Sequence, residues 1–447
     1  MKRLYDENLY RFDTPQPSYW EATAKDIDVR AEPLAGNGSC DVAIIGGGYT
    51  GLSAGLHLAR DYNIDVRVLE AGHVGWGASG RNGGFCCPGG SATGLTGLVK
   101  QVGADSARAY ARITEDAVNL VRDLGDAEGL EFQSYGSAEV GVAHTPKAFE
   151  VFKEDYEVAR KHLGVDWEIV DADAFRDRYF DCTEQFGGLI QRPTFGLHPL
   201  RFCRGLANAA LRHGAKLHEH SEVREWSKSD GMHRLTTDGG TLRAKRVIFA
   251  TNGFIDESLN EHFKDRTLPI ISAIIVTRPL TADERTAAGW KTEHPAYNSR
   301  RVMNYYRMLP DNRFLFGGRA RSDGRASDDE ATFGGLQSML AQFWPAWANV
   351  EIEYRWQGLV CFTGSLLPSV GQLDDDPSVF FGYGYHGSGV STATWTGKQL
   401  ADWIGTGNPQ GLPAMIQGIG KRFPLARMRT RYLRAGIAFS GWLDRRG

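Results

Sequence analysis

Three glycines and a glutamate near the N-terminus have the spacing of a phosphate-binding turn. Gly46, Gly48 and Gly51 form a G-x-G-x-x-G pattern within "DVAIIGGGYTGLSAGLHLAR". In such a pattern the first glycine permits a tight turn, the second lets the backbone approach a pyrophosphate, and the third lets a helix pack closely on a strand. Glu70 follows 24 positions after Gly46, where its carboxylate can accept hydrogen bonds from ribose hydroxyls. The spacing therefore predicts a dinucleotide-binding site.

The residues around these glycines predict the elements that would hold them. Residues 41–46 form a short apolar run rich in β-branched side chains, which is typical of a buried parallel strand. Residues 49–60 place Leu52 and Leu56 on one helical face, and residues 65–70 read as a second strand. This βαβ unit sets the glycines at the start of the helix, where unpaired N–H groups and the helix dipole favour phosphate.

Two later segments favour a flavin over a nicotinamide cofactor. "AKRVIFATNGF" is an apolar strand ending in Thr251 and Gly253, and small residues there would let the backbone approach an adenosine. Residues 378–404 read as a strand, a turn with Gly387 and Gly389, and a helix. The start of that helix would face negative charge, such as the N1–C2=O edge of a reduced isoalloxazine. The alternative is a second NAD-type turn, but no acidic residue about 20 positions later supports it.

Composition and charge exclude several other classes of protein. The chain has 447 residues, 42% hydrophobic content and a formal net charge of -3, with no basic block that would indicate a nucleic-acid partner. The N-terminus lacks the apolar core of a signal peptide, and no apolar run approaches the ~18 residues of a transmembrane helix. Six irregularly spaced cysteines argue against a disulfide framework. We expect a soluble, cytoplasmic protein of two or three domains, and the sequence leaves its oligomeric state open.

The chain resembles the D-amino-acid oxidase-like family of FAD-dependent oxidoreductases over nearly its whole length. The resemblance is carried by the glycine motif and by "VLEAGHVGWGASGRNGG", "NYYRMLPDNRFLFGGR", "YRWQGLVCFTGSLLPSVG" and "GYGYHGSGV". Within the family, the chain resembles in particular the gamma-glutamylputrescine oxidoreductases. The resemblance implies bound FAD and hydride transfer to flavin N5 from a carbon that bears an amine. The resulting imine would hydrolyse to an aldehyde or keto product plus amine or ammonia. The expected partners are a small-molecule amine and oxygen or another electron acceptor.

Four positions depart from the family pattern. Leu315 stands where sarcosine oxidases carry a lysine that promotes the reaction with oxygen, so the acceptor stays open between oxygen and another molecule. Gly358 stands where those enzymes attach FAD through a cysteine, so we expect non-covalent FAD even though Cys361 lies nearby. His386 and Ser388 are interchanged relative to the "GYSGHGV" of the gamma-glutamylputrescine enzymes, which could retune the flavin or the choice of substrate.

A predicted hairpin supplies the candidates for substrate contact. The segment "MNYYRMLPDNRFLFGGRAR" reads as two strands joined at residues 310–312. Alternation places Tyr305 and Arg307 on one face and Tyr306 on the other. The resemblance puts this hairpin in the roof of the substrate cavity, so the catalytic candidates are Tyr306, Arg307, Arg319 and His386. An arginine there could clamp a carboxylate, and the alternative is that it pairs with a surface acid.

The cofactor-binding candidates come from the three glycine-rich segments and from the loop after Glu70. Arg81 in that loop could contact the flavin or its phosphates, and the alternative is a surface arginine. The neighbouring Cys86 and Cys87 are interpreted as buried spectator thiols. His218 and His220 alternate on one strand, but no third ligand supports a metal site, so none is expected. The full set is Gly46, Gly48, Tyr49, Thr50, Gly51, Glu70, Ser79, Arg81, Asn82, Val223, Thr251, Gly253, Gly387, Ser388, Gly389 and Val390.

The expected fold is α/β (α+β overall), with a Rossmann-like FAD-binding domain and an inserted antiparallel-sheet substrate domain. A discontinuous FAD-binding domain takes residues 37–125, 195–262 and 355–435. The substrate, or cap, domain takes residues 126–194 and 263–354. Residues 1–36 form an N-terminal arm, and residues 436–447 form a C-terminal tail. The basic segment 427–447 is expected to be a solvated helix, and the alternative is contact with a partner or a membrane surface.

Three other functions compete with the oxidation of gamma-glutamylputrescine. The first is a dehydrogenase or oxidase for another amine or N-methyl amino acid, of the sarcosine, glycine or taurine type. The second is a flavin-binding protein without turnover, which predicts that no amine reduces the flavin. The third, an NAD-dependent dehydrogenase, lacks any nicotinamide-domain pattern in the sequence.

Overall fold

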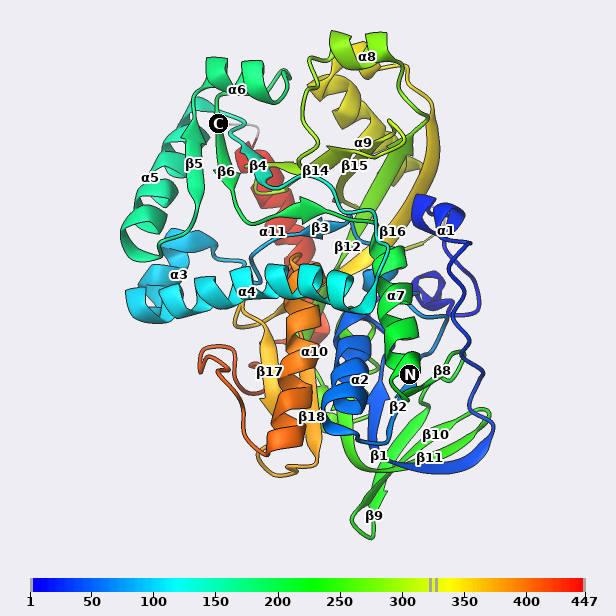
Figure 1. Cartoon of the computed structure of the whole chain (residues 1–447). Helices are drawn as coiled ribbons and strands as arrows, with labels where there is room; N and C mark the ends of the chain where they lie inside the picture. Colours follow the sequence, from blue (N-terminus) through cyan, green and yellow to red (C-terminus); the bar gives the residue numbers. More distant parts are fainter. Residues whose placement is uncertain (1–2, 321–323, 326–328, 445–447) are drawn as a thin grey trace.

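The first of two large sheets is built around the predicted βαβ unit. The computed structural model describes residues 3–320, 324–325 and 329–444 of the chain. β1 lies between β11 and β2 and is parallel to both, and β18 extends the parallel set beyond β11 (Figure 1). The sheet has the order β17-β18-β11-β1-β2-β8, with β10 and β9 beside β11. Its strands are β1 (Gly36–Ile45), β2 (Val66–Leu69), β8 (Lys216–His218), β9 (Glu225–Ser229), β10 (Met232–Thr237), β11 (Gly240–Phe249), β17 (Ser369–Gln372) and β18 (Val379–Tyr383).

Helices cover this sheet and begin at the same edge. α2 (Tyr49–Tyr62) joins β1 to β2, is buried over most of its length, and ends at Asn63 in the left-handed conformation. It packs along α10 (Gly389–Thr406) and α7 (Pro199–Arg212), and α4 (Ala104–Glu128) also packs on α10 (Figure 1). Because α2 follows β1 and α10 follows β18, both helix N-termini lie at the carboxyl ends of the parallel strands, where ligands bind in such sheets.

The second large sheet forms the cap. Its order is β16-β12-β15-β14-β13-β4-β6-β5, and neighbouring strands are antiparallel except β13 and β4. Aromatic rings of Trp290, Phe314, Trp344 and Trp347 pack together in the cap core. The predicted α/β fold with an antiparallel cap is thus confirmed. The strands are β4 (Glu139–Val142), β5 (Trp167–Val170), β6 (Gly188–Gln191), β12 (Thr267–Thr277), β13 (Ala296–Asn298), β14 (Tyr305–Met308), β15 (Phe314–Arg319) and β16 (Ile352–Thr363).

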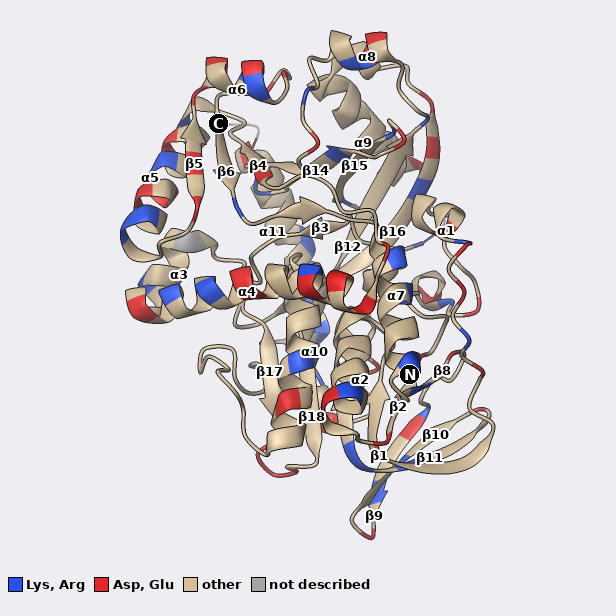
Figure 2. Ribbon diagram, in the orientation of Figure 1, with Lys and Arg blue, Asp and Glu red and all other residues tan. Residues whose placement is uncertain are grey.

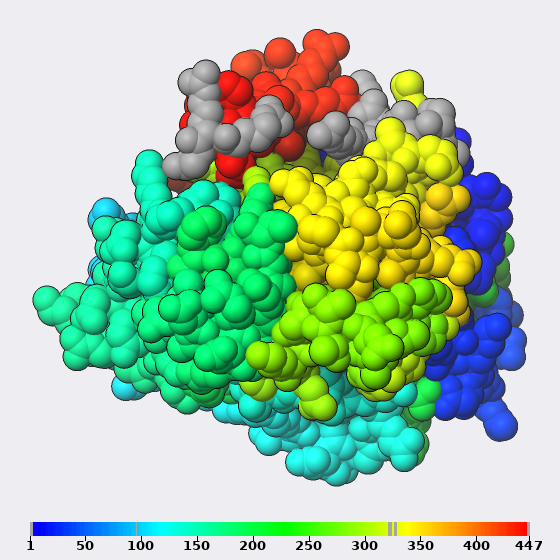
Figure 3. Space-filling view, turned by 90° about the horizontal axis from the view of Figure 1, so that it is seen from above, coloured from blue at the N-terminus to red at the C-terminus, as the bar shows by residue number. Residues whose placement is uncertain are grey.

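Two of the expected domain boundaries differ from those in the structure. β16 pairs with β12 along its length, so the cap sheet extends beyond residue 355 to Thr363. α11 (Arg429–Asp444) runs through the expected boundary at 435–436 and lies against the cap (Figure 3). The other elements are α1 (Tyr19–Thr23), α3 (Gly94–Val102), α5 (Pro146–His162), α6 (Ala172–Arg178), α8 (Ala282–Ala287), α9 (Asp329–Phe343), and the small sheet of β3 (Phe85–Cys86) and β7 (Phe195–Gly196).

The N-terminal arm packs on the body of the protein. Trp20 is buried, and its indole N–H donates to the carbonyl of Asn82 at 2.9 Å. Acidic and basic residues alternate along outer helices such as α4 and α5 (Figure 2). Among the described residues, none of the helices combines the length and the apolar composition needed to span a bilayer.

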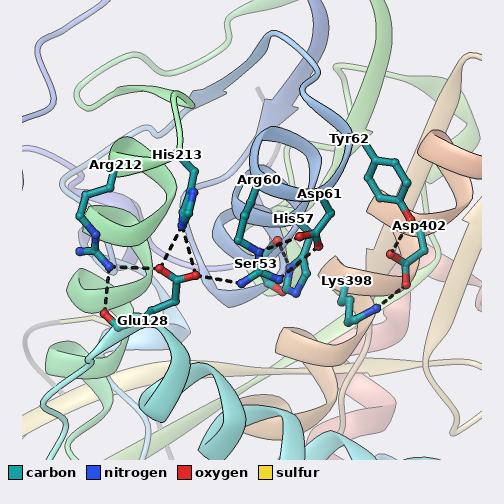
Figure 4. A network of polar contacts seen from close by, with 10 residues as sticks. All are labelled: Ser53, His57, Arg60, Asp61, Tyr62, Glu128, Arg212, His213, Lys398 and Asp402. Carbon is teal, nitrogen blue, oxygen red and sulfur yellow. Dashed lines mark hydrogen bonds and ion pairs between the residues drawn. The ribbon is translucent and has the colours of Figure 1, made fainter.

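A polar network ties the helices of the first domain together (Figure 4). The Glu128 carboxylate, at the end of α4, pairs with Arg60 of α2 at 2.8 Å and with Arg212 at the end of α7 at 3.2 Å. His213 adds a contact to the same carboxylate at 3.1 Å, and the Glu128 side chain is only 7% exposed. Burial opposes its ionisation, yet hydrogen bonds from Arg60 and His213 lower the pKa of Glu128 below its usual value. One carboxylate therefore joins three helices.

Replacing Glu128 by alanine should destabilise the protein by roughly 2 kcal/mol, between the values for exposed and buried ion pairs. The matched control is Glu150→Ala, because Glu150 pairs with Lys153 at 2.8 Å on an exposed face of α5. That control should cost less than about 0.5 kcal/mol. Urea unfolding of both variants measures the difference, and equal losses would contradict a bracing role for Glu128.

Candidate flavin and substrate site

A cavity of about 1300 Å³ lies between the two sheets. Its floor comes from the ends of β1 and β2 and the starts of α2 and α10. Its roof is the face of the cap sheet that carries Ser272, Tyr305 and Arg319, and residues of α11 close one side. The two glycine-rich turns found in the sequence therefore open into one space.

The first turn has the geometry that its glycines predict. Gly46 has a φ of +112°, which favours glycine, and a Cβ there would lie 2.7 Å from the carbonyl oxygen of Ala250. A Cβ on Gly51 would lie 2.0 Å from the carbonyl oxygen of Gly46, so helix and strand meet without room for a side chain. Glu70 accepts hydrogen bonds from the N–H groups of Gly47 at 2.6 Å and Gly72 at 2.9 Å. These bonds hold the carboxylate at the floor of the cavity.

The polar groups around the cavity fit an anionic cofactor. The Arg81 guanidinium is buried 3.8 Å from the centre of the Trp76 ring, and its Nε donates to the carbonyl of Trp76 at 2.6 Å. Its Nη2 has no partner among the described residues, and neither does the hydroxyl of Thr251, which also lines the cavity. Burial lowers the pKa of Arg81 to about 9. An acceptor from FAD would satisfy these donors, while the two helix N-termini favour its phosphates and the edge of its ring.

Most of the predicted cofactor residues meet at this cavity. Gly51 and Gly253 are not in its wall: Gly51 packs against Gly46, and a Cβ on Gly253 would lie 3.3 Å from Leu359 of β16. These two glycines serve close packing beneath the site. The predicted residues that line the cavity are Gly46, Gly48, Tyr49, Thr50, Glu70, Ser79, Arg81, Asn82, Val223, Thr251, Gly387, Ser388, Gly389 and Val390.

The structure separates the four catalytic candidates. Arg319 and His386 line the cavity, but Tyr306 and Arg307 do not. Tyr306 is buried in the cap core, with its ring centre 5.0 Å from that of Trp344. Tyr306 lies on the core face of β14, so the prediction that it contacts the substrate is wrong.

Arg307 shares a strand face with Tyr305 but lies beyond the edge of the cavity. It is fully buried, and its Nη2 donates to the carbonyl of Leu197 at 2.8 Å. Its guanidinium faces the ring of Tyr135 at 4.9 Å. Arg307 therefore braces the hairpin against the first domain, which corrects its expected contact with the substrate.

His386 connects the second glycine turn to the end of β16 and to the loop at Gly90. Its Nε2 accepts a hydrogen bond from the N–H of Thr363 at 3.2 Å, and its Nδ1 donates to the carbonyl of Gly90 at 3.1 Å. Burial lowers the pKa of His386 to about 4, so the ring is neutral at pH 7. In this state it holds the turn in place.

Buried histidines should make the protein lose stability as the pH falls below 6.5. Burial lowers the pKa of His57 to about 4 and that of His198 to about 3, as it does for His386. Between pH 6.5 and 4 the unfolded chain binds more protons than the folded chain, so each histidine removes on the order of 1–3 kcal/mol of stability there. Urea unfolding of the wild type and of His57→Gln checks this. The advantage of the wild type should shrink as the pH falls, and a constant difference would contradict it.

The structure shows where the residues that depart from the family pattern lie relative to the cavity. Leu315 is buried in an apolar cluster with Trp20 and Trp356 and does not line the cavity, so its alignment with the oxygen-promoting lysine of sarcosine oxidases is corrected. No lysine is among the described residues that line the cavity. Gly358 and Cys361 of β16 both line it, and burial raises the pKa of Cys361 to about 12.

Several lining residues were not singled out from the sequence. They include Tyr305, whose hydroxyl lies 2.9 Å from that of Ser272, and Tyr297, whose hydroxyl donates to Gln191 at 2.8 Å. Glu139 of β4 and Ile437 of α11 also line the cavity. Alternation within β13 and β14 marks a tyrosine-bearing face, but only the folded cap shows which face meets the cavity.

This arrangement defines a class: a two-domain oxidoreductase fold with a dinucleotide turn under an antiparallel cap. The chain belongs to the DAO family of FAD dependent oxidoreductases, whose family model matches residues 41–403. It is thus an FAD-dependent oxidoreductase, and bound FAD would supply the two-electron acceptor. The groups that would hold FAD are the two glycine turns, Glu70 and Arg81.

Known proteins agree with this assignment. The chain is 29% identical to the gamma-glutamylputrescine oxidoreductase of Escherichia coli (strain K12) over 410 residues, which covers 92% of this chain and 94% of that protein. The glycine oxidase structure from Geobacillus kaustophilus aligns with a TM-score of 0.69 at 19% identity, covering 86% of this chain and 100% of that chain. The L-proline dehydrogenase structure from P. horikoshii aligns with a TM-score of 0.68 at 19% identity, covering 84% and 95%. These two likenesses show the fold.

Proposed function

We propose that this enzyme oxidises a primary amine at the end of a long substrate that also carries a carboxylate, with gamma-glutamylputrescine as the best candidate. Arg319 is the observation that supports this substrate class. It lines the roof of the cavity, and it forms no ion pair with any residue that the structure describes. Burial lowers its pKa to about 10, so it stays a cation at pH 7. A half-buried guanidinium that lines a cavity and has no acid beside it fits a substrate carboxylate.

The protein's own residues would bind and orient the substrate. Arg319 would hold the carboxylate under the cap sheet, and the apolar side chains of Ile270, Ile274 and Leu359 would exclude water from the chain between the two ends. FAD bound at the glycine turns, Glu70 and Arg81 without a covalent bond would supply the two-electron acceptor. The similarity to the enzyme of Escherichia coli supports the choice of gamma-glutamylputrescine over shorter amines.

A second candidate is the oxidation of a smaller amino acid such as glycine or sarcosine. The glycine oxidase of Bacillus licheniformis, 24% identical over 388 residues, keeps this candidate open. In that case Arg319 would bind the carboxylate of an amino acid whose own nitrogen reacts.

A substrate panel separates the candidates. Gamma-glutamylputrescine, putrescine, glycine and sarcosine are each supplied with oxygen or with an artificial electron-accepting dye, and aldehyde or keto acid is measured. Our proposal expects gamma-glutamylputrescine to give the highest kcat/KM with at least one acceptor. Preference for glycine or sarcosine would support the second candidate, and no turnover with any amine would support a non-catalytic flavoprotein.

A further inference from the structure

Glu139 is a carboxylate in the cavity wall whose pKa is affected by burial alone, with no contribution from a cation among the residues that the structure describes. Glu139 is the first residue of β4 and lines the cavity. Val140 and Val142 of the same strand are buried in the cap core, so alternation places Glu139 and Gly141 on the opposite face, toward the cavity. No hydrogen bond or ion pair joins the side chain of Glu139 to another described residue. The function proposed above does not use this acid.

Two polar neighbours accompany Glu139 on this face. Gln191 of β6 lies opposite Glu139 in the strand register. Tyr297 of β13 lies across Gly141, because a Cβ there would be 2.9 Å from the tyrosine hydroxyl, and that hydroxyl donates to Gln191 at 2.8 Å. We call Glu139, Gln191 and Tyr297 the polar corner. All three line the cavity, and the tyrosine and glutamine bond each other, which leaves the carboxylate without a partner in the corner.

The polar corner lies beside the second glycine turn. Cys87 connects the two: burial and the nearby charge of Glu139 raise the pKa of its thiol, and its Sγ lies 3.9 Å from the hydroxyl of Ser388. Ser388 is the residue before α10, in the turn that faces the flavin ring in our assignment. A group bound at the polar corner would therefore lie in the same cavity as the turn that faces the flavin ring in our assignment.

The isolation of Glu139 has an energetic consequence. Burial raises the pKa of Glu139 to about 8, and no cation offsets the cost of its charge. A half-buried acid in a cavity wall, with a raised pKa and no paired cation, indicates a functional site more strongly than an acid paired with arginine. A ligand that brings a positive charge would remove the penalty and would gain a charge-assisted hydrogen bond.

We propose that the polar corner is an ammonium-binding subsite, in which Glu139 accepts hydrogen bonds from the amine end of the substrate. This inference rests on the proposed function for the identity of the substrate. The ammonium-binding subsite also explains why the enzyme would prefer a long substrate. Strand β4 is separated from strand β15, which carries Arg319, by three strand spacings, or ~14 Å. A free amino acid is too short to bridge that span, whereas a glutamyl group joined to a four-carbon diamine is comparable in length.

The test compares two isosteric variants of the FAD-loaded enzyme. Glu139→Gln keeps the shape and removes the charge. Glu115→Gln is the matched control, because Glu115 also lines the cavity but lies on α4, away from the cap sheet. The KM for gamma-glutamylputrescine should rise about 10- to 100-fold in Glu139→Gln. In Glu115→Gln it should change by less than about threefold. FAD content and urea unfolding confirm that both variants fold.

A second measurement separates this inference from the proposed function. Butylguanidinium is a cation with no oxidisable amine carbon of the expected kind, and its binding to the FAD-loaded enzyme is followed by calorimetry. The wild type should bind it about 10-fold or more tightly than Glu139→Gln. Equal binding, or no binding to the wild type, would overturn the subsite whatever the activity. If no amine reduces the wild-type flavin, the proposed function fails, while the calorimetry still decides the role of Glu139.

Discussion

Replacing Gly51 by alanine should reduce the affinity for FAD by about 100-fold, equivalent to ~2.7 kcal/mol. The added Cβ would lie 2.0 Å from the carbonyl oxygen of Gly46 and 3.1 Å from Ile44, so the phosphate-binding turn must move. Gly51 itself does not line the cavity, so the loss would come through displacement of the turn. Equilibrium dialysis of FAD against the apoprotein measures the affinity.

The control for this prediction lies one helical turn further along α2. A Cβ on Gly55 would lie 3.4 Å from Val68 and 3.8 Å from Ile44, which are ordinary contacts. Gly55→Ala should change the affinity for FAD by less than about twofold, and it should stabilise the helix by up to ~1 kcal/mol. Equal loss of FAD in both variants would contradict the close helix–strand contact at Gly51 as the cause.

Replacing Arg319 by methionine should lower kcat/KM for gamma-glutamylputrescine by about 100-fold, because the substrate carboxylate would be left without its cation inside the cavity. Methionine keeps the length and apolar stem of the side chain. Putrescine, which has no carboxylate, should lose less than about threefold with the same variant. Steady-state kinetics with both substrates checks this difference.

A third variant tests the geometry at Arg319. Arg319→Lys should recover only part of the lost activity, because an ammonium cannot form the two parallel bonds of a guanidinium with a carboxylate. If Arg319→Met weakened putrescine and gamma-glutamylputrescine equally, the arginine would be a structural brace, and the carboxylate would have to bind elsewhere.

The sequence predicts those parts of the protein that depend on local chemistry. The turn at Gly46–Gly51 needs particular backbone conformations, the helix after it needs one apolar face, and Glu70 needs the end of a strand. Each requirement produces a recognisable sequence pattern within a few residues. The hairpin from Tyr305 to Arg319 can also be predicted from the sequence, because two alternating strands flank a Pro-Asp-Asn turn.

The rest depends on contacts between distant segments. Alternation separates Tyr305 from Tyr306, but both faces of β14 are apolar enough to be buried, so the sequence does not say which meets the cavity. The sequence suits Arg307 to a substrate, because its contacts with Leu197 and Tyr135 come from distant segments and exist only in the folded protein. α11 is a largely exposed helix, as its basic sequence predicts, but the sequence does not show that Leu433 and Ile437 also line the cavity. Glu139 carries no motif, and its isolation emerges only when β4, β6 and β13 pair.

The most direct test of the account follows the visible absorbance of the bound flavin during anaerobic mixing with gamma-glutamylputrescine. We predict rapid bleaching of the flavin absorbance, at a rate that saturates with substrate concentration. Oxygen or a dye added to the bleached enzyme then identifies the electron acceptor. A bound flavin that stays oxidised with gamma-glutamylputrescine would contradict the proposed substrate and would leave a flavoenzyme of another specificity or a flavoprotein without turnover.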